Sequence, residues 1–172
     1  MKRVISSLLI CFTLLTAGCS QVSTQKYSEV SRVRSFASES ELSSASDLVV
    51  IGTVTKQSSV KAKDFVDDLL ISTISLERDL KGKADAKMNV RQFQVQIDGE
   101  KSTDLKVGKS YLLYLTLTGL QGDAADDYYV TGVDSGIYEQ VLSATAEKKY
   151  TRVAHLQGDK LPESLTESEV SK

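Results

Sequence analysis

The sequence predicts an all-β domain, a small barrel or sandwich of about six short strands. Three observations lead to this fold class. Apolar stretches between residues 46 and 155 have the length of strands, turn residues separate them, and helical periodicity is nearly absent. The spacing of the stretches does not choose between a barrel and a sandwich.

The N-terminal segment has the composition of a secretory signal. Met1-Lys2-Arg3 precedes an apolar stretch, Val4 to Leu15, which is shorter than the roughly 20 residues that cross a bilayer as a helix. The following Leu-Thr-Ala-Gly-Cys resembles the lipobox of bacterial lipoproteins. The resemblance implies a signal peptide at residues 1–18, cleavage between Gly18 and Cys19, and diacylglycerol on Cys19. The alternative is an ordinary signal peptide with a coincidental cysteine.

The charge and the cysteines of the mature chain limit its partners. Removal of the first 18 of 172 residues leaves 154, enough for one domain with tethers, and changes the formal charge from -2 to -4. This balance provides no basic surface, so we expect no nucleic-acid partner. Cys11 leaves with the signal, so no internal disulfide can form and the core alone must stabilise the domain.

Residues 19–45 are rich in serine and are predicted to be a lipidated tether. Within them, Ser38 and Glu41 have the spacing of a capping box, which predicts a short helix leading into the domain. Serine modification is the less favoured interpretation.

The predicted domain spans residues 46–155. Residues 47–56 form a continuous apolar run, as in a strand buried on both faces, and residues 110–120 place apolar side chains on both faces. Residues 69–82 alternate as a half-buried strand. In residues 88–97 the apolar phase changes between Val90 and Phe93, which predicts a bulge.

The end of the chain is less regular. The segments DYYVTGV and GIYEQVL, separated by Asp134-Ser135, predict a hairpin. Residues 144–152 suit an edge strand or a short helix. Residues 156–172 are predicted to be a polar C-terminal tail.

The order of four segments, SDLVVIGTV, LERDLKGK, VGKSYLLYL and YYVTGVDSGIYE, resembles that in small lipoproteins of single-membrane bacteria. It is also similar to netrin-like and metalloproteinase-inhibitor domains over roughly residues 46–142. The resemblance implies an OB-type β-barrel of about five to six strands, with a short flanking helix. The inhibitors chelate zinc through a free N-terminal cysteine amine held by disulfides. This chemistry does not transfer, because Cys19 is expected to be lipidated and no second cysteine survives.

No catalytic or metal-binding pattern stands out. His155 is the only histidine and has no paired motif, so we interpret it as an ordinary surface residue. Two acidic groups lack the spacing and glycine of an EF-hand, and we expect solvated loops with no metal or cofactor; calcium binding and glycoside hydrolysis are the alternatives. These groups are Asp64, Asp67 and Asp68, and Asp123, Asp126 and Asp127.

Tyr114, Tyr128, Tyr129 and Tyr138 are candidates for a ligand or partner surface, because exposed aromatic side chains are common at interfaces. The favoured competing interpretation places them in the core, with the hydroxyl groups at its rim.

These observations predict a lipid-anchored binding or protein-interaction module on the extracytoplasmic face of the cell membrane, without evident catalysis. Its expected partners are the membrane, through diacylglyceryl-Cys19, and another envelope or secreted protein. Two alternatives stay open. An envelope hydrolase would need clustered carboxylates in a concave pocket with raised pKa values, and a structural spacer would lack a sizeable exposed apolar patch.

Overall fold

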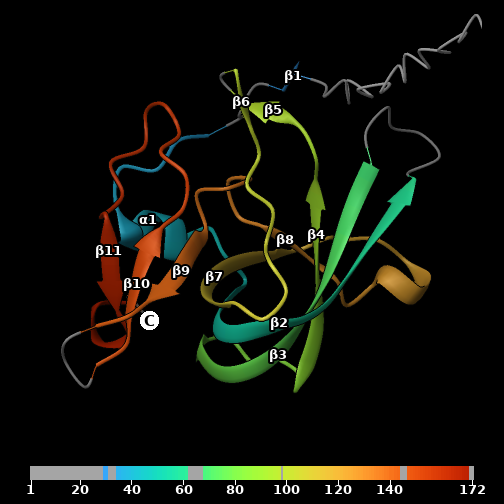
Figure 1. Ribbon diagram of the computed structural model, residues 1–172, viewed down its shortest axis with the longest axis horizontal. Helices are drawn as coiled ribbons and strands as arrows, with labels where there is room; N and C mark the ends of the chain where they lie inside the picture. Colours follow the sequence, from blue (N-terminus) through green and yellow to red (C-terminus); the bar gives the residue numbers. More distant parts are fainter. Residues whose placement is uncertain (1–28, 31–33, 62–67, 98, 144–146, 171–172) are drawn as a thin grey trace, which may run out of the picture.

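The computed structural model describes residues 29–30, 34–61, 68–97, 99–143 and 147–170 (Figure 1). The predicted signal peptide, Gly18, Cys19, and the acidic residues Asp64 and Asp67 lie outside the described residues. Within the described residues, β-strands dominate, and no helix is long and apolar enough to span a membrane.

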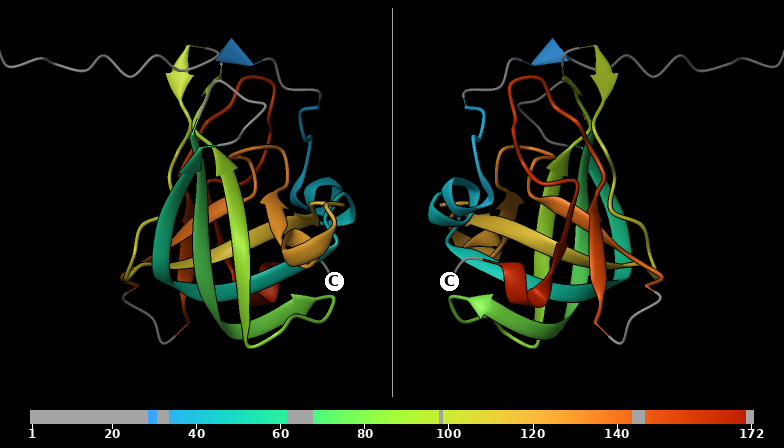
Figure 2. Two further views of the ribbon diagram at one scale, coloured as in Figure 1. Left: turned by 90° about the vertical axis from the view of Figure 1, so that its right-hand side faces the viewer. Right: turned by 90° about the vertical axis from the view of Figure 1, so that its left-hand side faces the viewer.

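Five strands close into a barrel (Figure 2). The strand order is β2-β3-β4-β8-β7, and β7 returns to β2. All neighbouring strands are antiparallel except β4 and β8, which pair in parallel. This closure confirms the predicted OB-type barrel. The strands are β2 (Leu48–Lys61), β3 (Asp68–Lys81), β4 (Lys87–Phe93), β7 (Ser110–Leu117) and β8 (Tyr128–Val130).

Strands β2 and β7 bury both of their faces, as their apolar runs predict. Their alternate residues contribute to two separate cores. The interior core fills the barrel and includes Leu48, Val50, Ile74, Val90, Leu113, Leu115 and Val130. The outer core lies on the other face of β2 and β7 and includes Val49, Ile51, Leu112, Tyr114 and Tyr138.

The segments around Asp134-Ser135 do not form the predicted hairpin. Strand β8 and strand β9 (Ile137–Val141) instead pair with β7, at its opposite ends. The amide of Tyr114 donates to the carbonyl of Gly136 at 2.9 Å, and its carbonyl accepts from the amide of Thr131 at 2.9 Å. Residues 132–135 therefore form a loop between β8 and β9, and β7 pairs with the chain on both sides of this loop.

The prediction of a polar tail from residue 156 is wrong. Where an edge strand or a short helix was expected, β10 (Lys149–Arg152) forms, but it is not an edge, because it pairs with both β9 and β11 (Ser164–Thr166). The short helix η2 (Glu167–Glu169) follows β11. Leu161, Leu165 and Val170 are buried in the outer core. A few apolar side chains thus fix a segment whose overall composition is polar.

The predicted helix exists as α1 (Glu39–Ser44), and the Ser38 hydroxyl accepts a hydrogen bond of 3.2 Å from the Glu41 amide. The tether boundary at residue 45 is wrong, because Phe36 and Leu42 are buried in the outer core. Residues 34–45 therefore belong to the domain and cover the outer face of the barrel.

The bulge predicted between Val90 and Phe93 is also absent. Met88, Val90 and Gln92 keep one inward face to the end of β4, and the phase changes after Phe93. A three-stranded sheet follows at this end of the barrel, in which β1 pairs with β5 and β5 with β6. Its strands are β1 (Glu29–Val30), β5 (Gln96–Ile97) and β6 (Glu100–Lys101); the short η1 helix (Gly122–Ala124) lies between β7 and β8.

Candidate functional site

Two of the four candidate tyrosines cannot form a partner surface. Tyr114 and Tyr138 are fully buried in the outer core, with ring centroids 6.0 Å apart. The hydroxyl group of Tyr114 donates a hydrogen bond of 2.7 Å to Glu39. Burial raises the pKa of both tyrosines, so both rings stay uncharged. The competing interpretation, core packing, applies to this pair.

The other two candidates are partly buried near the contact between β4 and β8. Tyr128 packs against the interior core, and burial raises its pKa. Tyr129 stacks on Phe93, with ring centroids 5.6 Å apart and an interplanar angle of 23°. Tyr129 therefore belongs to an aromatic pair that the sequence analysis did not identify.

This aromatic pair forms a wall of a cavity of about 150 Å³, here called the aromatic cavity. Nearby, the Arg91 Nε donates to Asp127 Oδ2 at 2.5 Å, and the Asn89 amide group donates to Asp127 Oδ1 at 3.1 Å. The bond to Asp127 fixes the Arg91 side chain. Its guanidinium group is therefore held at the cavity and does not extend freely into solvent. The cavity is lined by Arg91, Gln92, Phe93, Tyr129, Val130, Val133 and Asp134.

A second cavity of about 230 Å³, here called the polar cavity, also has Asp134 in its lining. Lys101, Ser102, Thr103 and His155 supply polar groups to it. Ile97, Val153, Ala154 and Leu156 supply apolar groups. Ile97 and Leu156 belong to a third small apolar cluster with Val95, against which Phe93 and Val133 pack. The two cavities therefore lie on a common apolar base.

Asp134, which both cavities share, is only 2% exposed. Burial raises the pKa of its carboxyl group to about 6. A hydrogen bond of 2.6 Å from the Thr103 amide opposes this shift, and the nearby charge of Asp104 adds to it. Asp134 can therefore exchange a proton near neutral pH. A raised pKa in a cavity is a physical mark of a functional site.

The loop that carries Asp134 has an unusual backbone. Val133 adopts a left-handed conformation with φ of 67°, which is rare for a β-branched residue. Neighbouring contacts hold this conformation of Val133. The Ser135 hydroxyl group donates to Asp159 at 2.7 Å. Gly132 has a φ of 70°, and a Cβ atom added to it would lie 2.5 Å from the Phe36 ring. Strain of this kind is often found where side chains are held in a fixed position for function.

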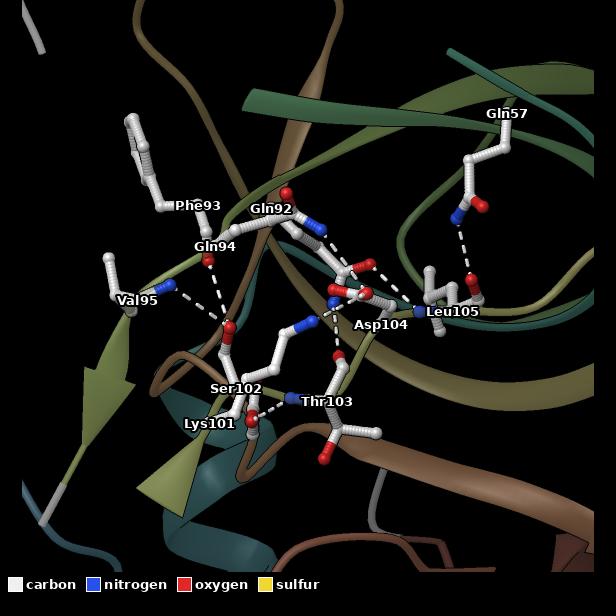
Figure 3. A network of polar contacts seen from close by, with 11 residues as sticks. Gln57, Gln92, Phe93, Gln94, Val95, Lys101, Ser102, Thr103, Asp104 and Leu105 are labelled. Carbon is white, nitrogen blue, oxygen red and sulfur yellow. Dashed lines mark hydrogen bonds and ion pairs between the residues drawn. The ribbon is translucent and has the colours of Figure 1, made fainter. Parts of the chain in front are cut away.

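A polar network braces the segment between β6 and β7 against the barrel end (Figure 3). The buried side-chain amide of Gln92 donates to the carbonyl of Thr103 at 2.8 Å and accepts from the amide of Leu105 at 3.1 Å. Gln57 donates to the carbonyl of Leu105 at 2.6 Å. Ser102 bridges the backbone of Phe93 and Val95, accepting from the Val95 amide at 3.2 Å. These bonds fix the position of Thr103, whose backbone amide donates to Asp134.

The remaining sequence candidates have ordinary surroundings. Asp123 and Asp126 are exposed, whereas Asp127 is buried in its pair with Arg91. His155 is exposed, lines the polar cavity, lies 2.8 Å from Arg152 and approaches Glu163 at 3.6 Å. Within the described residues, no group of three or more potential metal ligands occurs.

A third cavity, of about 340 Å³, lies between β3 and the C-terminal segment. Apart from Ile51 its lining is charged, and four of the five charged side chains pair with one another: Lys148 with Glu77 at 2.7 Å, and Arg78 with Glu167. The hydrogen bond from Lys148 keeps the pKa of Glu77 below its usual value. We interpret these ion pairs as contacts that hold the C-terminal part of the chain against the barrel. This cavity is therefore a weaker candidate for a functional site than the other two.

No protein-family model matches the chain, and no curated protein matches it. Function must therefore be argued from the site itself. Phe93, Gln92, Val133 and Asp134 were not among the site residues predicted from the sequence. Two glycines flank Asp134 in TGVDSG, and this pattern indicated a turn rather than a buried carboxyl group.

Proposed function

We propose that this protein is a lipid-anchored, extracytoplasmic protein-interaction module, and that its contact surface is the barrel end with the aromatic and polar cavities. The observation that carries the proposal is the adjacency of the two cavities, which share Asp134 and rest on one apolar cluster. Apolar side chains of the described strands pack together in the barrel interior.

The size of the cavities supports a protein partner. Their volumes of about 150 and 230 Å³ each lie below the roughly 300 to 1,000 Å³ that is typical of small-molecule sites. Cavities of this size suit single side chains of a partner, the arrangement found at energetic centres of protein interfaces. Tyr129 and Arg91 are residue types enriched at such interfaces.

The anchor in this proposal is Cys19, as the lipobox resemblance implies. We expect Cys19→Ala to release the protein from membranes or to block its maturation. Phase partitioning in detergent measures the release, with Cys11→Ala as a matched control that leaves anchoring intact. Unchanged partitioning of the Cys19→Ala protein would refute the anchor.

The contact surface is tested by crosslinking capture on intact cells, followed by mass spectrometry, with an untethered domain as a control. We expect one reproducible protein whose capture falls at least about ten-fold in Phe93→Ala and Tyr129→Ala, as for an interface centre. Leu142→Ala, which truncates a fully exposed side chain elsewhere, serves as the matched control. Capture that is insensitive to Phe93 and Tyr129 would exclude this surface.

A second candidate function, an envelope hydrolase, is favoured by one observation: Asp134 is a carboxyl group with a raised pKa in a cavity. Glycoside hydrolysis needs a second carboxyl group, and Asp104 is the neighbour whose charge reaches Asp134. Asp104, however, interacts with Gln94 at 3.2 Å and with Lys101 at 3.9 Å. Release of reducing sugars from purified cell walls, lost in Asp134→Asn, would favour this function over the interaction module.

A further inference from the structure

The cavity end of the barrel is also the end at which the N-terminal segment meets the domain. Strand β1 pairs in parallel with β5, and the register places Glu29 beside Gln96 and Val30 beside Ile97. Ile97 lines the polar cavity. Figures 1 and 2 show β1 beside β5 and β6 at one end of the molecule, with the turn between β3 and β4 at the opposite end.

Covalent geometry limits how far this end can lie from the anchor. Glu29 follows Cys19 by ten positions in the sequence. A polypeptide covers at most about 3.5 Å per residue, so the distance is at most about 35 Å in any conformation. A globular chain of this length is roughly 40 Å across. Because this limit is shorter than the width of the domain, the domain cannot stand with the turn at residues 82–86 on the lipid and the β1 end a full domain width away.

From this placement we infer that the protein stands on the membrane with its cavity end toward the bilayer, and that its partner is a membrane-embedded envelope protein rather than a freely diffusing secreted one. This inference rests on the proposed function, because it needs both the lipid on Cys19 and the contact surface at the cavities. A membrane-embedded protein presents its extracytoplasmic segments within the same short distance of the bilayer that the tether allows.

The orientation is measured by energy transfer from a fluorophore on the domain to an acceptor-labelled lipid in the vesicle. The mature chain has Cys19 as its only thiol, and acylation blocks it, so one introduced cysteine can be labelled specifically. Lys101→Cys places the donor on β6 at the cavity end. Lys83→Cys places it on the far turn and is a matched control, since both lysines are exposed.

We expect transfer from position 101 to exceed transfer from position 83 by at least about two-fold, given the short tether. Equal transfer, or greater transfer from position 83, would overturn the inferred orientation while leaving the anchor in place. Protein that stays in the supernatant, with no transfer from either position, would instead show that the lipid anchor is wrong.

A second pair of variants tests the role of β1. Proline at both Glu29 and Val30 removes the amide donors of this strand and should detach it from β5. The first fixed point would then be near Arg34, 15 residues from Cys19, and the difference between positions 101 and 83 should shrink. Proline at both Ser23 and Thr24 is the matched control and should preserve the difference. A difference that survives the β1 prolines would exclude this docking as the cause.

The partner class is tested by fractionating the crosslinked complex. A captured protein that partitions into detergent after its crosslink to the anchored protein is cut supports a membrane-embedded partner. A captured protein that is recovered from the culture medium without detergent would contradict it.

Discussion

The backbone amide of Thr103 donates a hydrogen bond of 2.6 Å to the carboxyl group of Asp134, although 31 positions of sequence separate the two residues. The bond ties the segment after β6 to the loop between β8 and β9, and both residues line the polar cavity. Among the described residues, no cationic side chain forms an ion pair with Asp134, so this amide is its main stabilising partner. Its ionisation should therefore affect stability.

Asp134→Asn tests this effect. The pKa of Asp134 rises from the usual 3.8 to about 6 on folding, so between these values the folded state binds more protons than the unfolded state. The free energy of unfolding must then fall as the pH rises through this window, by up to about 3 kcal/mol. The variant lacks this loss, so its stability relative to the wild type should rise from pH 4 to pH 7.

Urea unfolding at a series of pH values measures the difference. Asparagine can still accept the hydrogen bond from Thr103. Asp123→Asn, at an exposed aspartate, is the control and should show no such trend. A stability difference between Asp134→Asn and the wild type that is constant with pH would show that Asp134 ionises normally.

Gln92 fills an inward position at the barrel end that its neighbours on β4 fill with apolar side chains. Gln92→Leu would keep the approximate volume but leave the carbonyl of Thr103 and the amide of Leu105 without their partner. Leaving one buried and one partly buried backbone group unpaired should reduce the free energy of unfolding by about 2–4 kcal/mol. Gln94→Leu, which removes one bond to the partly exposed Asp104, should reduce it by less than about 1 kcal/mol. Equal losses in denaturant unfolding would rule out the bracing role of Gln92.

Barrel strands β2 and β7 could be predicted from the sequence, because their local pattern of apolar residues agrees with their burial in the folded domain. The runs at 47–56 and 110–120 are apolar at successive positions, and both faces of β2 and β7 are indeed buried. The capping spacing of Ser38 and Glu41 likewise predicted α1, since a cap depends on residues within one helical turn.

The errors arise where distant pairing decides the structure. Asp134-Ser135, flanked by two glycines, has the local pattern of a hairpin turn. Tyr114, however, bonds the chain on both sides of this loop and keeps β8 and β9 along one strand. The C-terminal segment has no alternation, because β11 is a three-residue edge strand that buries Leu165 alone among its residues. Neither outcome has a signal within a local window.

The candidate site could be predicted only in part. Tyr129 was identified from its residue type, but the burial of Tyr114 and Tyr138 depends on α1 and on the C-terminal segment, which the sequence analysis placed outside the domain. Asp134 carries no local sign of burial. Its raised pKa results from contacts with residues 31 positions away.

The two buried tyrosines should respond differently to removal of the hydroxyl group. Tyr114→Phe removes a hydrogen bond to Glu39 and should reduce the free energy of unfolding by about 1.5–3 kcal/mol, the usual range for a bond to a charged group. The hydroxyl group of Tyr138 is buried with no hydrogen-bond partner among the described residues. Tyr138→Phe should therefore leave stability unchanged or raise it by about 1 kcal/mol. Thermal or urea unfolding of the two variants measures the contrast, and a large loss in Tyr138→Phe would reveal a partner for that hydroxyl group.

Truncation of two leucines tests whether the C-terminal segment belongs to the folded domain. Leu165 on β11 is 4% exposed and packs in the outer core, whereas Leu142, just after β9, is fully exposed. Leu165→Ala should reduce the free energy of unfolding by about 2–4 kcal/mol, since it removes buried methyl groups and leaves a cavity. Leu142→Ala, the same chemical change, should alter it by no more than about 0.5 kcal/mol. Urea unfolding of both proteins gives the comparison. If Leu165→Ala were as stable as Leu142→Ala, residues 156–170 would behave as a tail after all, and the outer core would have to be complete without them.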